Sequence, residues 1–202
     1  MGEMLSAAGS MQWFRDTLAA GVRFADLDAG AAEWVPGSDG LVFLPYLAGE
    51  RTPHADPDAR GAFIGLSLRH DRPAMVRAVM EGVAYGLRDS LELLTDLGVR
   101  ADGGRASGGG ARSRLWLSIV ASVLGLPLEL TAVEEGSAFG AALLGGVAGG
   151  VFGDVHEAVN TCVRVREVVE PEPSWRETYA DGYSRFRALY PALRPHFGTL
   201  GG

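Results

Sequence analysis

Three consecutive glycines, Gly108, Gly109 and Gly110, stand in the middle of the stretch "ASGGGARSRLW". Glycine permits a tight turn with positive φ or a close approach of two backbones, and it also lets a ligand touch the main chain. The residues that follow are typical of a helix, whose first free N–H groups would face an anion such as a phosphate. Two interpretations of this loop therefore stay open, turn geometry and ligand binding.

A dinucleotide-binding fingerprint is matched only in part by this loop. Gly108 and Gly110 fit its first two glycine positions, but Ser113 occupies the third, and no acidic residue follows at the expected distance. The pattern taken alone favours turn geometry over a ligand site.

The other side chains able to do chemistry are scattered. Glu50, Asp56 and Asp58 lie in a polar loop and match no calcium-loop spacing, which indicates solvated charge. Neither Cys162 nor any histidine has a partner at metal-ligand spacing. The histidines are His54, His70, His156 and His196. We predict no catalytic residue and no metal ligand in this chain.

The composition of the 202-residue chain excludes several functional classes. All 18 basic residues are arginine, so a P-loop, which requires lysine, and Schiff-base chemistry, which requires a primary amine, are excluded. A net charge of −7 without a basic run argues against a nucleic-acid partner. No apolar run could span a bilayer, the start lacks a signal peptide, and Cys162 cannot form an internal disulfide. We expect a cytoplasmic protein with one domain, residues 1–202.

Hydrophobic periodicity predicts helices that alternate with short strands, which is typical of an α/β domain. Ser10 is expected to cap the first helix, and Asp71 is expected to cap the long helix 73–97. Glu134 and Glu135 are expected to complement the dipole of the small-residue helix that follows them. Helices are predicted at 11–20, at 73–97, from near Ser113 until Gly125 and Pro127 end the helix, at 137–146, and from 175 onward, where aromatic residues form a stripe. Strands are predicted at 41–44, 62–66, 128–131 and 162–169.

Five segments of the sequence, taken in chain order, resemble segments of a known protein family. They are "AAGSMQWFRD", "FLPYLAGERTPHADPDARGAFIGLSLRH", "AVMEGVAYGLRDSLELL", "SGGGARSRLWLSIVASVLGLPLEL" and "EEGSAFGAALLG". Together they resemble the C-terminal domain of the FGGY carbohydrate kinases over about residues 1–190. The phrase "PYLAGERTPHADPDARGAF" is more similar to the xylulokinase branch of the family than to the glycerol kinase branch. One departure is Ala74, where the family's second signature has a polar residue.

The resemblance implies a fold and a reaction. Family members resemble actin and Hsc70, with two ribonuclease-H-like α/β domains, the first binding most of the sugar and the second holding ATP in the cleft. This chain resembles the second domain, a mixed sheet flanked by helices, and the first domain with its general-base aspartate is not found in it. The implied reaction transfers a phosphoryl group from ATP to xylulose with the help of Mg²⁺. The chain by itself is expected to be inactive.

The resemblance also implies which residues form the adenosine side of the cleft. Gly109, Gly110 and Ala111 form the loop on which adenosine lies, so the glycines let a nucleotide approach the backbone. Ser113 and Arg114 lie at the adenine edge. The position of Arg114 is an asparagine in glycerol kinase, so stacking of the guanidinium on the base is an alternative to a hydrogen bond.

Two further residues are implied near the phosphates. Gly9 and Gln12 match family positions there, with Gln12 in the first turn of a helix, where N–H groups are unpaired. The small-residue helix after Ser137 is expected to pack beneath the nucleotide loop.

Two other functions stay open beside the kinase half. The chain could be a non-catalytic nucleotide-binding module, or an assembly domain whose exposed apolar surface promotes self-association as a homodimer. ATP or ADP and a sugar held mainly by the first domain are the expected partners of the kinase half, with no nucleic acid and no membrane.

Overall fold

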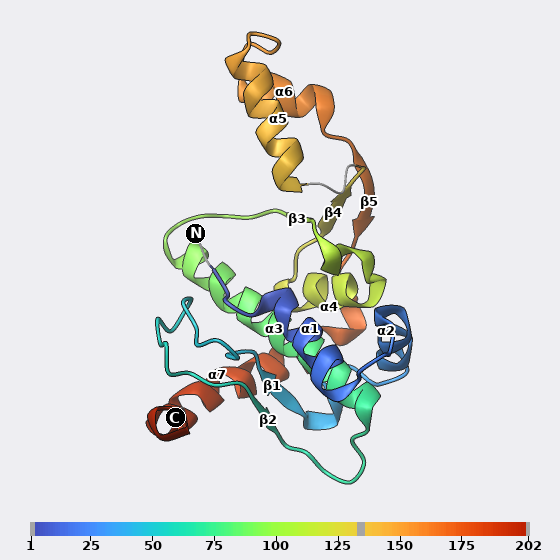
Figure 1. Cartoon of the computed structure of the whole chain (residues 1–202), viewed down its shortest axis with the longest axis vertical. Coiled ribbons are helices and arrows are strands. Elements are labelled where there is room, and N and C mark those ends of the chain that lie inside the picture. The colour runs from blue at the N-terminus through green and yellow to red at the C-terminus, as the bar shows by residue number, and fades with distance from the viewer. Residues whose placement is uncertain (1–2, 133–135, 201–202) are drawn as a thin grey trace.

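The computed structural model describes residues 3–132 and 136–200. Its helices are α1 (Ala7–Leu18), α2 (Phe24–Ala32), α3 (Arg72–Asp96), α4 (Arg114–Leu124), α5 (Gly136–Ala148), α6 (Val155–Cys162) and α7 (Arg176–Leu200). Its strands are β1 (Val42–Leu44), β2 (Ala62–Ile64), β3 (Gly104–Ala106), β4 (Leu128–Thr131) and β5 (Val165–Val169). Three 3₁₀ turns, η1 (Ser38–Gly40), η2 (Gly109–Arg112) and η3 (Pro173–Trp175), complete the order shown in Figure 1.

The long helix α3 contacts other elements on two sides. Helices α1, α2 and α4 lie on one side of it, and β1 and α7 lie on the other (Figure 1). The start of α3 follows from the sequence, because the Asp71 carboxylate accepts a hydrogen bond from the Ala74 N–H at 3.0 Å, as predicted for a cap. A Cβ at Gly82 would lie 2.2 Å from the Phe43 carbonyl oxygen, so only glycine lets α3 cross β1 this closely.

The apolar stripe of α3 is buried over part of its length. Val76, Val79 and Val83 are fully buried, as the periodicity predicts. Leu87 and Leu91, further along the same stripe, are only partly buried. The continuous buried stretch of α3 therefore ends at Gly86, and Asp89 is the last buried residue of the helix.

Two small sheets are present in the described part of the chain. β1 and β2 pair antiparallel, and a mixed sheet has the order β3-β4-β5, with β3 parallel and β5 antiparallel to β4. Helix α4 covers one face of the mixed sheet and shares a small core with it. That core consists of Leu117, Ala121, Leu128, Leu130 and Val169. The predicted mixed sheet flanked by helices is confirmed.

A buried polar network lies in the main hydrophobic core of the chain, between α3 and α7. Arg77 donates to the Glu81 carboxylate at 3.0 Å, and Ser38 and the Gly37 N–H donate to the same carboxylate at 2.7 and 2.9 Å. The Tyr179 hydroxyl lies 3.1 Å from both the Arg77 guanidinium and the Glu81 carboxylate. Since the Glu81 carboxylate holds the backbone of η1 in place, the network fixes this turn against two helices.

The aromatic stripe of the last helix packs as predicted. Tyr179, Tyr183, Phe186 and Tyr190 are all buried in the main hydrophobic core. Trp175 precedes the helix and lies in η3 instead.

Several sequence predictions of local structure are wrong. The first helix begins at Ala7, one turn earlier than predicted, and Ser10 lies inside it, with its hydroxyl donating to the Ser6 carbonyl rather than capping the helix. Helix α2 was not predicted. The strand predicted from Cys162 begins at Val165, because α6, capped by the Asp154 side chain, includes Cys162.

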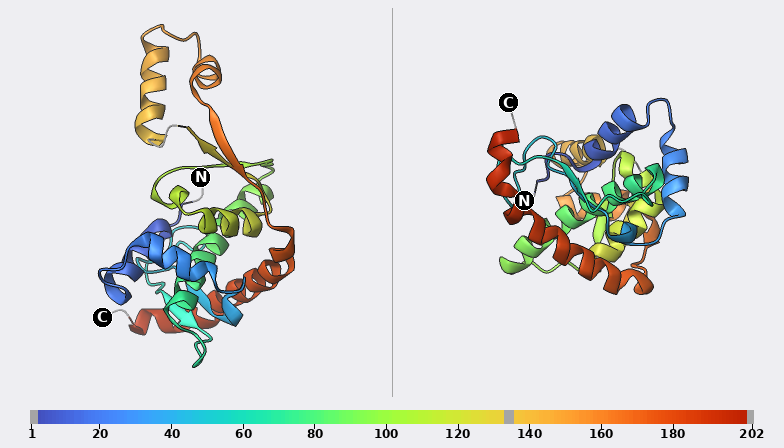
Figure 2. Two further views of the ribbon diagram at one scale, coloured as in Figure 1. Left: turned by 90° about the vertical axis from the view of Figure 1, so that its right-hand side faces the viewer. Right: turned by 90° about the horizontal axis from the view of Figure 1, so that it is seen from below.

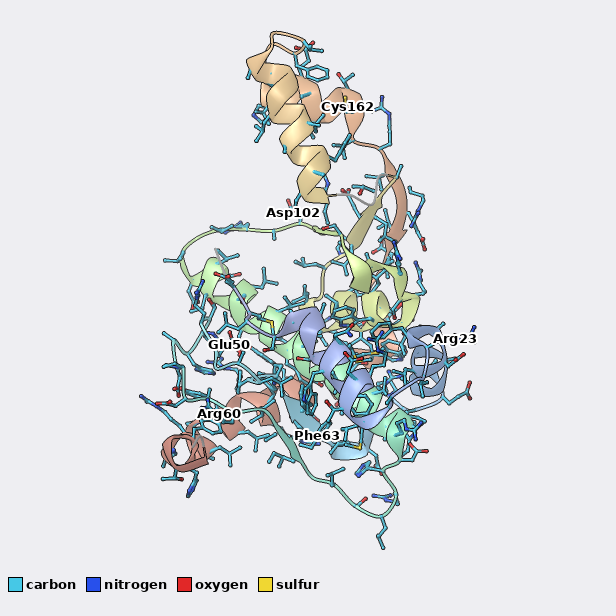
Figure 3. All side chains as sticks on the ribbon, in the orientation of Figure 1. Arg23, Glu50, Arg60, Phe63, Asp102 and Cys162 are labelled. Atoms are coloured by element: carbon cyan, nitrogen blue, oxygen red, sulfur yellow. The ribbon has the colours of Figure 1, made fainter. Side chains whose placement is uncertain are left out.

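Helices α5 and α6 project beyond the end of the mixed sheet (Figure 1, Figure 2), and Cys162 lies in this projection (Figure 3). The first residue of α5, Gly136, lies next to Ser107, while the rest of the helix extends away from the glycine loop. The prediction that this helix packs beneath the loop is wrong, because its main neighbour is α6 and none of its residues is fully buried. Glu134 and Glu135 lie outside the described residues.

Candidate functional site

A cavity of about 610 Å³ lies between α1, α2, η2 and the start of α4. Of the seven residues predicted to contact a nucleotide, four line this cavity: Gln12, Gly109, Gly110 and Ser113. They come from two segments about 100 residues apart in the sequence, so the fold brings the two halves of the predicted site together.

The two glycines of the loop that line the cavity are required for different reasons. A Cβ on Gly110 would lie 1.8 Å from the Trp116 ring, so this glycine makes room for the first turn of α4. A Cβ on Gly109 would have no atom within 4 Å, so its bare backbone faces open space in the cavity. Gly108 adopts φ +82°, a value that favours glycine. The loop therefore combines turn geometry with an exposed backbone.

Ser113 connects the two walls of the cavity. Its hydroxyl accepts the Trp116 N–H at 2.9 Å, which caps α4, and donates to the carboxylate of Asp28 on α2. The hydroxyl proton is thus directed to the opposite wall. This bridge fixes the distance between the glycine loop and α2.

Three predicted residues do not line this cavity. Ala111 packs instead against the small core under the mixed sheet. Arg114 is exposed and forms an ion pair with Glu167 of β5. Gly9 lies in the exposed first turn of α1, next to Ala8, which does line the cavity.

The first turn of α1 differs from the prediction. Because the helix begins at Ala7, Gln12 lies in its second turn, and the side-chain amide donates to Asp16 at 2.5 Å. Hydrogen bonds from Arg15 and from Gln12 lower the pKa of Asp16. The N–H groups of Ala7, Ala8 and Gly9, one turn earlier, have no acceptor within the helix itself, and the helix dipole favours an anion in front of them.

Sequence reasoning missed the wall that α2 provides. Phe24 and Asp28 on this helix line the cavity, and the Arg15 guanidinium lies 4.4 Å from the centre of the Phe24 ring. Phe24, Leu27 and Ala31 are spaced three and four residues apart, which is typical of a helix and could have indicated α2. The segment was interpreted as turns because it contains several small residues. The cavity thus has largely apolar walls, with the Asp28 carboxylate, the Arg112 side chain and the Gln12 amide among its lining and the N–H groups of the first turn of α1 nearby.

A metal ion has no evident ligands in the described part of the chain. Among those residues, no three His, Cys, Asp or Glu side chains are grouped so that they could hold a metal. Of the described side chains that line the cavity, Asp28 is the one carboxylate, and it already accepts a hydrogen bond from the Ser113 hydroxyl. The residues of this cavity therefore do not fit a magnesium site built by the protein. The same described residues contain no helix that is both long and apolar enough to cross a membrane.

Comparison with known proteins identifies the relatives of the chain. Residues 1–149 match the family model described as the FGGY family of carbohydrate kinases, C-terminal domain. The xylulose kinase of Staphylococcus epidermidis is 37% identical over 190 residues, which cover 94% of this chain and 38% of that protein. The chain thus spans about two fifths of the length of the curated relatives it matches.

Solved structures agree with the sequence relatives. The structure of ligand-bound xylulose kinase from Lactobacillus acidophilus matches with a TM-score of 0.91 at 29% identity, over 99% of this chain and 41% of that chain. Xylulose kinase from Rhodospirillum rubrum matches with a TM-score of 0.86 at 40% identity, over 98% and 40%. These neighbours have the actin/Hsc70-like ribonuclease H fold, so the predicted fold class is confirmed. The chain belongs to the FGGY family of carbohydrate kinases, in which it corresponds to the C-terminal domain.

Proposed function

We propose that residues 1–202 form the nucleotide-binding half of an ATP-dependent carbohydrate kinase whose sugar is xylulose. The observation that carries the proposal is the cavity, in which the exposed backbone of Gly109 faces α2 beside the start of α1. The names of the xylulose kinases to which the chain is similar support the sugar. The sugar-binding half, which the chain does not contain by this proposal, would complete the cleft. A cytoplasmic location is part of the same proposal.

In the proposed arrangement adenosine lies along Gly109 and Gly110, with its base between the loop and Phe24. The phosphates extend toward the free N–H groups of Ala8 and Gly9, where the helix dipole stabilises negative charge. Magnesium would enter with the phosphates of ATP and offset their charge.

In this arrangement Ala111 and Arg114 hold the glycine loop in place from the side that does not line the cavity. Ala111 packs against the core under the sheet, and Arg114 pairs with Glu167. Their proposed contribution is to hold the loop, while contact with adenosine falls to the two glycines and Ser113.

The Gly109→Val variant tests this site. Its Cβ would have no protein atom within 4 Å, so we expect the side chain to occupy the cavity, ADP affinity to fall at least about tenfold and the urea unfolding midpoint to stay unchanged. Ligand-detected NMR titration with ADP measures the affinity. We expect weak binding by the parent chain, because part of the phosphate site is missing.

Gly140→Val is the matched control for this variant. Gly140 is also a helical glycine whose added Cβ would meet no atom within 4 Å, but it lies in α5. ADP binding by this control is expected to equal that of the parent. Undiminished ADP binding by a folded Gly109→Val variant would show that the nucleotide does not approach this backbone.

A second candidate function, self-association, is favoured by the uncovered apolar helix α5. Its residues are almost all apolar, yet none is fully buried, and Leu144 is 58% exposed. We expect the weight-average mass of the chain in sedimentation experiments to rise with concentration, and Leu144→Glu to shift it toward the monomer. Leu97→Glu, at an 80% exposed position after α3, is the control and should change nothing. A parent chain that stays monomeric at all concentrations would exclude this function.

A further inference from the structure

Asp28, a carboxylate that lines the cavity, has one oxygen without a hydrogen-bond partner among the described residues. Asp28 is half-buried on α2, and its Oδ1 accepts the hydroxyl proton of Ser113. Among the described residues, Ser113 is the one hydrogen-bond partner of this carboxylate, although an ionised carboxylate has about four acceptor sites. The second oxygen, Oδ2, is therefore available to a ligand in the cavity that Asp28 lines.

The neighbouring hydroxyl cannot supply the same contact. Ser113 has one proton, which goes to Asp28, and it also accepts the Trp116 N–H. At the Ser113–Asp28 pair itself a ligand group therefore meets acceptor atoms and no free hydroxyl donor, while the donors of Arg112 and Trp116 belong to other parts of the cavity lining. Such a site favours a ligand that donates a hydrogen bond here and disfavours one that presents an acceptor, since the two lone pairs would repel each other.

We propose that Asp28 is a specificity-determining residue of the cavity, whose free oxygen accepts a hydrogen bond from the 6-amino group of adenine. The inference rests on the proposed function, because adenosine along Gly109 and Gly110 places the edge of the base near the bridge between Ser113 and Asp28. The fixed distance between the two walls, set by that bridge, holds the carboxylate where the base edge arrives.

The alternative base for a carboxylate is guanine. Its O6 is an acceptor and would face Asp28 unfavourably, but its N1–H and 2-amino groups are donors that a carboxylate also accepts. GDP is therefore a necessary arm of the test. Purine riboside 5′-diphosphate is the third ligand, because it differs from ADP only in lacking the 6-amino group.

Asp28→Asn is the decisive variant, and Asp26→Asn is its matched control. The Ser113 hydroxyl holds the oxygen of the new amide, so the amide nitrogen takes the cavity side and meets the 6-amino group donor to donor. Asp26 is on the same helix but is exposed and paired with Arg23, which lies at the outer edge of the molecule (Figure 3). Asp28→Ala removes the carboxylate without adding a hydrogen-bond donor. It therefore shows whether an effect of Asp28→Asn comes from the loss of the carboxylate or from the new amide.

The experiment measures the affinities of the three diphosphates by ligand-detected NMR titration of the 202-residue chain, with urea unfolding to verify folding. We expect the parent and Asp26→Asn to bind ADP about tenfold more tightly than purine riboside diphosphate, and more tightly than GDP. The preference for ADP over purine riboside diphosphate should fall to about one in Asp28→Ala and to one or below in Asp28→Asn, where two donors face each other. A purely structural role for Asp28 would weaken both ligands equally and leave the ratio intact.

The outcomes separate this inference from the proposed function. A parent chain that binds no nucleotide would overturn both. ADP binding with no preference over purine riboside diphosphate, or with a preference that survives in both Asp28 variants, would overturn the role of Asp28 and leave the nucleotide site standing. Tighter binding of GDP than of ADP would show that the carboxylate reads guanine, which also overturns the assignment to adenine.

Discussion

Given ATP, Mg²⁺ and D-xylulose, the 202-residue chain is expected to release ADP no faster than it does without the sugar. General-base assistance typically contributes about 10²–10⁴-fold and requires hydrogen-bond reach of the reacting hydroxyl. Holding the two reactants in line contributes at least as much. The cavity has a single described carboxylate, which we assign to the base of the nucleotide, and by our proposal the sugar is held outside this chain. A coupled assay for ADP release measures the rate.

Asp58→Asn is the control for a hidden catalytic base. Asp58 lies exposed in the loop between β1 and β2 and does not line the cavity, so its loss should leave the background rate unchanged. Sugar-dependent turnover that disappears in Asp58→Asn would contradict the proposal of a half-enzyme. It would place a catalytic base inside these 202 residues.

Arg77→Met is expected to lower the free energy of unfolding by about 3–5 kcal/mol. Arg77 and Glu81 are only 1% and 2% exposed, and removal of the guanidinium leaves a buried carboxylate without its counter-charge. Burial raises the pKa of Glu81, while Arg77 acts in the opposite direction. The variant should therefore take up a proton at Glu81 more readily than the parent. Urea unfolding measures the change in free energy.

Arg88→Met provides the comparison for Arg77→Met on the same helix. Arg88 and Glu92 form an ion pair with the same spacing of four residues, at 3.2 Å, but both side chains reach solvent. Its loss should cost about 1 kcal/mol or less, including the contact of Arg88 with the Tyr183 ring. Equal losses in the two variants would show that burial does not set the strength of the Arg77 pair.

Local signals in the sequence located several elements correctly. Asp71 caps α3, and Gly125 ends α4 with φ +68°, because capping depends on residues within one turn of the helix end. The start of α1 was missed for a related reason. Ser10 resembles a cap in sequence, but an Oγ that donates to the carbonyl four residues earlier is equally compatible with a helix interior.

Burial of an apolar helix was less predictable from the sequence. The small apolar residues of α5 indicate close packing, yet the helix projects from the sheet with α6 as its main neighbour. Whether such a helix is buried depends on the surfaces that reach it. Those surfaces come from other segments, and the composition of the helix contains no information about them.

The sequence by itself determined the family, the α/β class and the glycine loop, because each depends on residue types in order along the chain. Only the tertiary structure decided that Gly109 faces a cavity while Gly110 makes room for Trp116. It also decided that Asp28 meets Ser113 across 85 residues of sequence. A hydrogen bond between such distant residues leaves no periodic pattern in the chain, since it forms only after two separately specified helices have packed against α3.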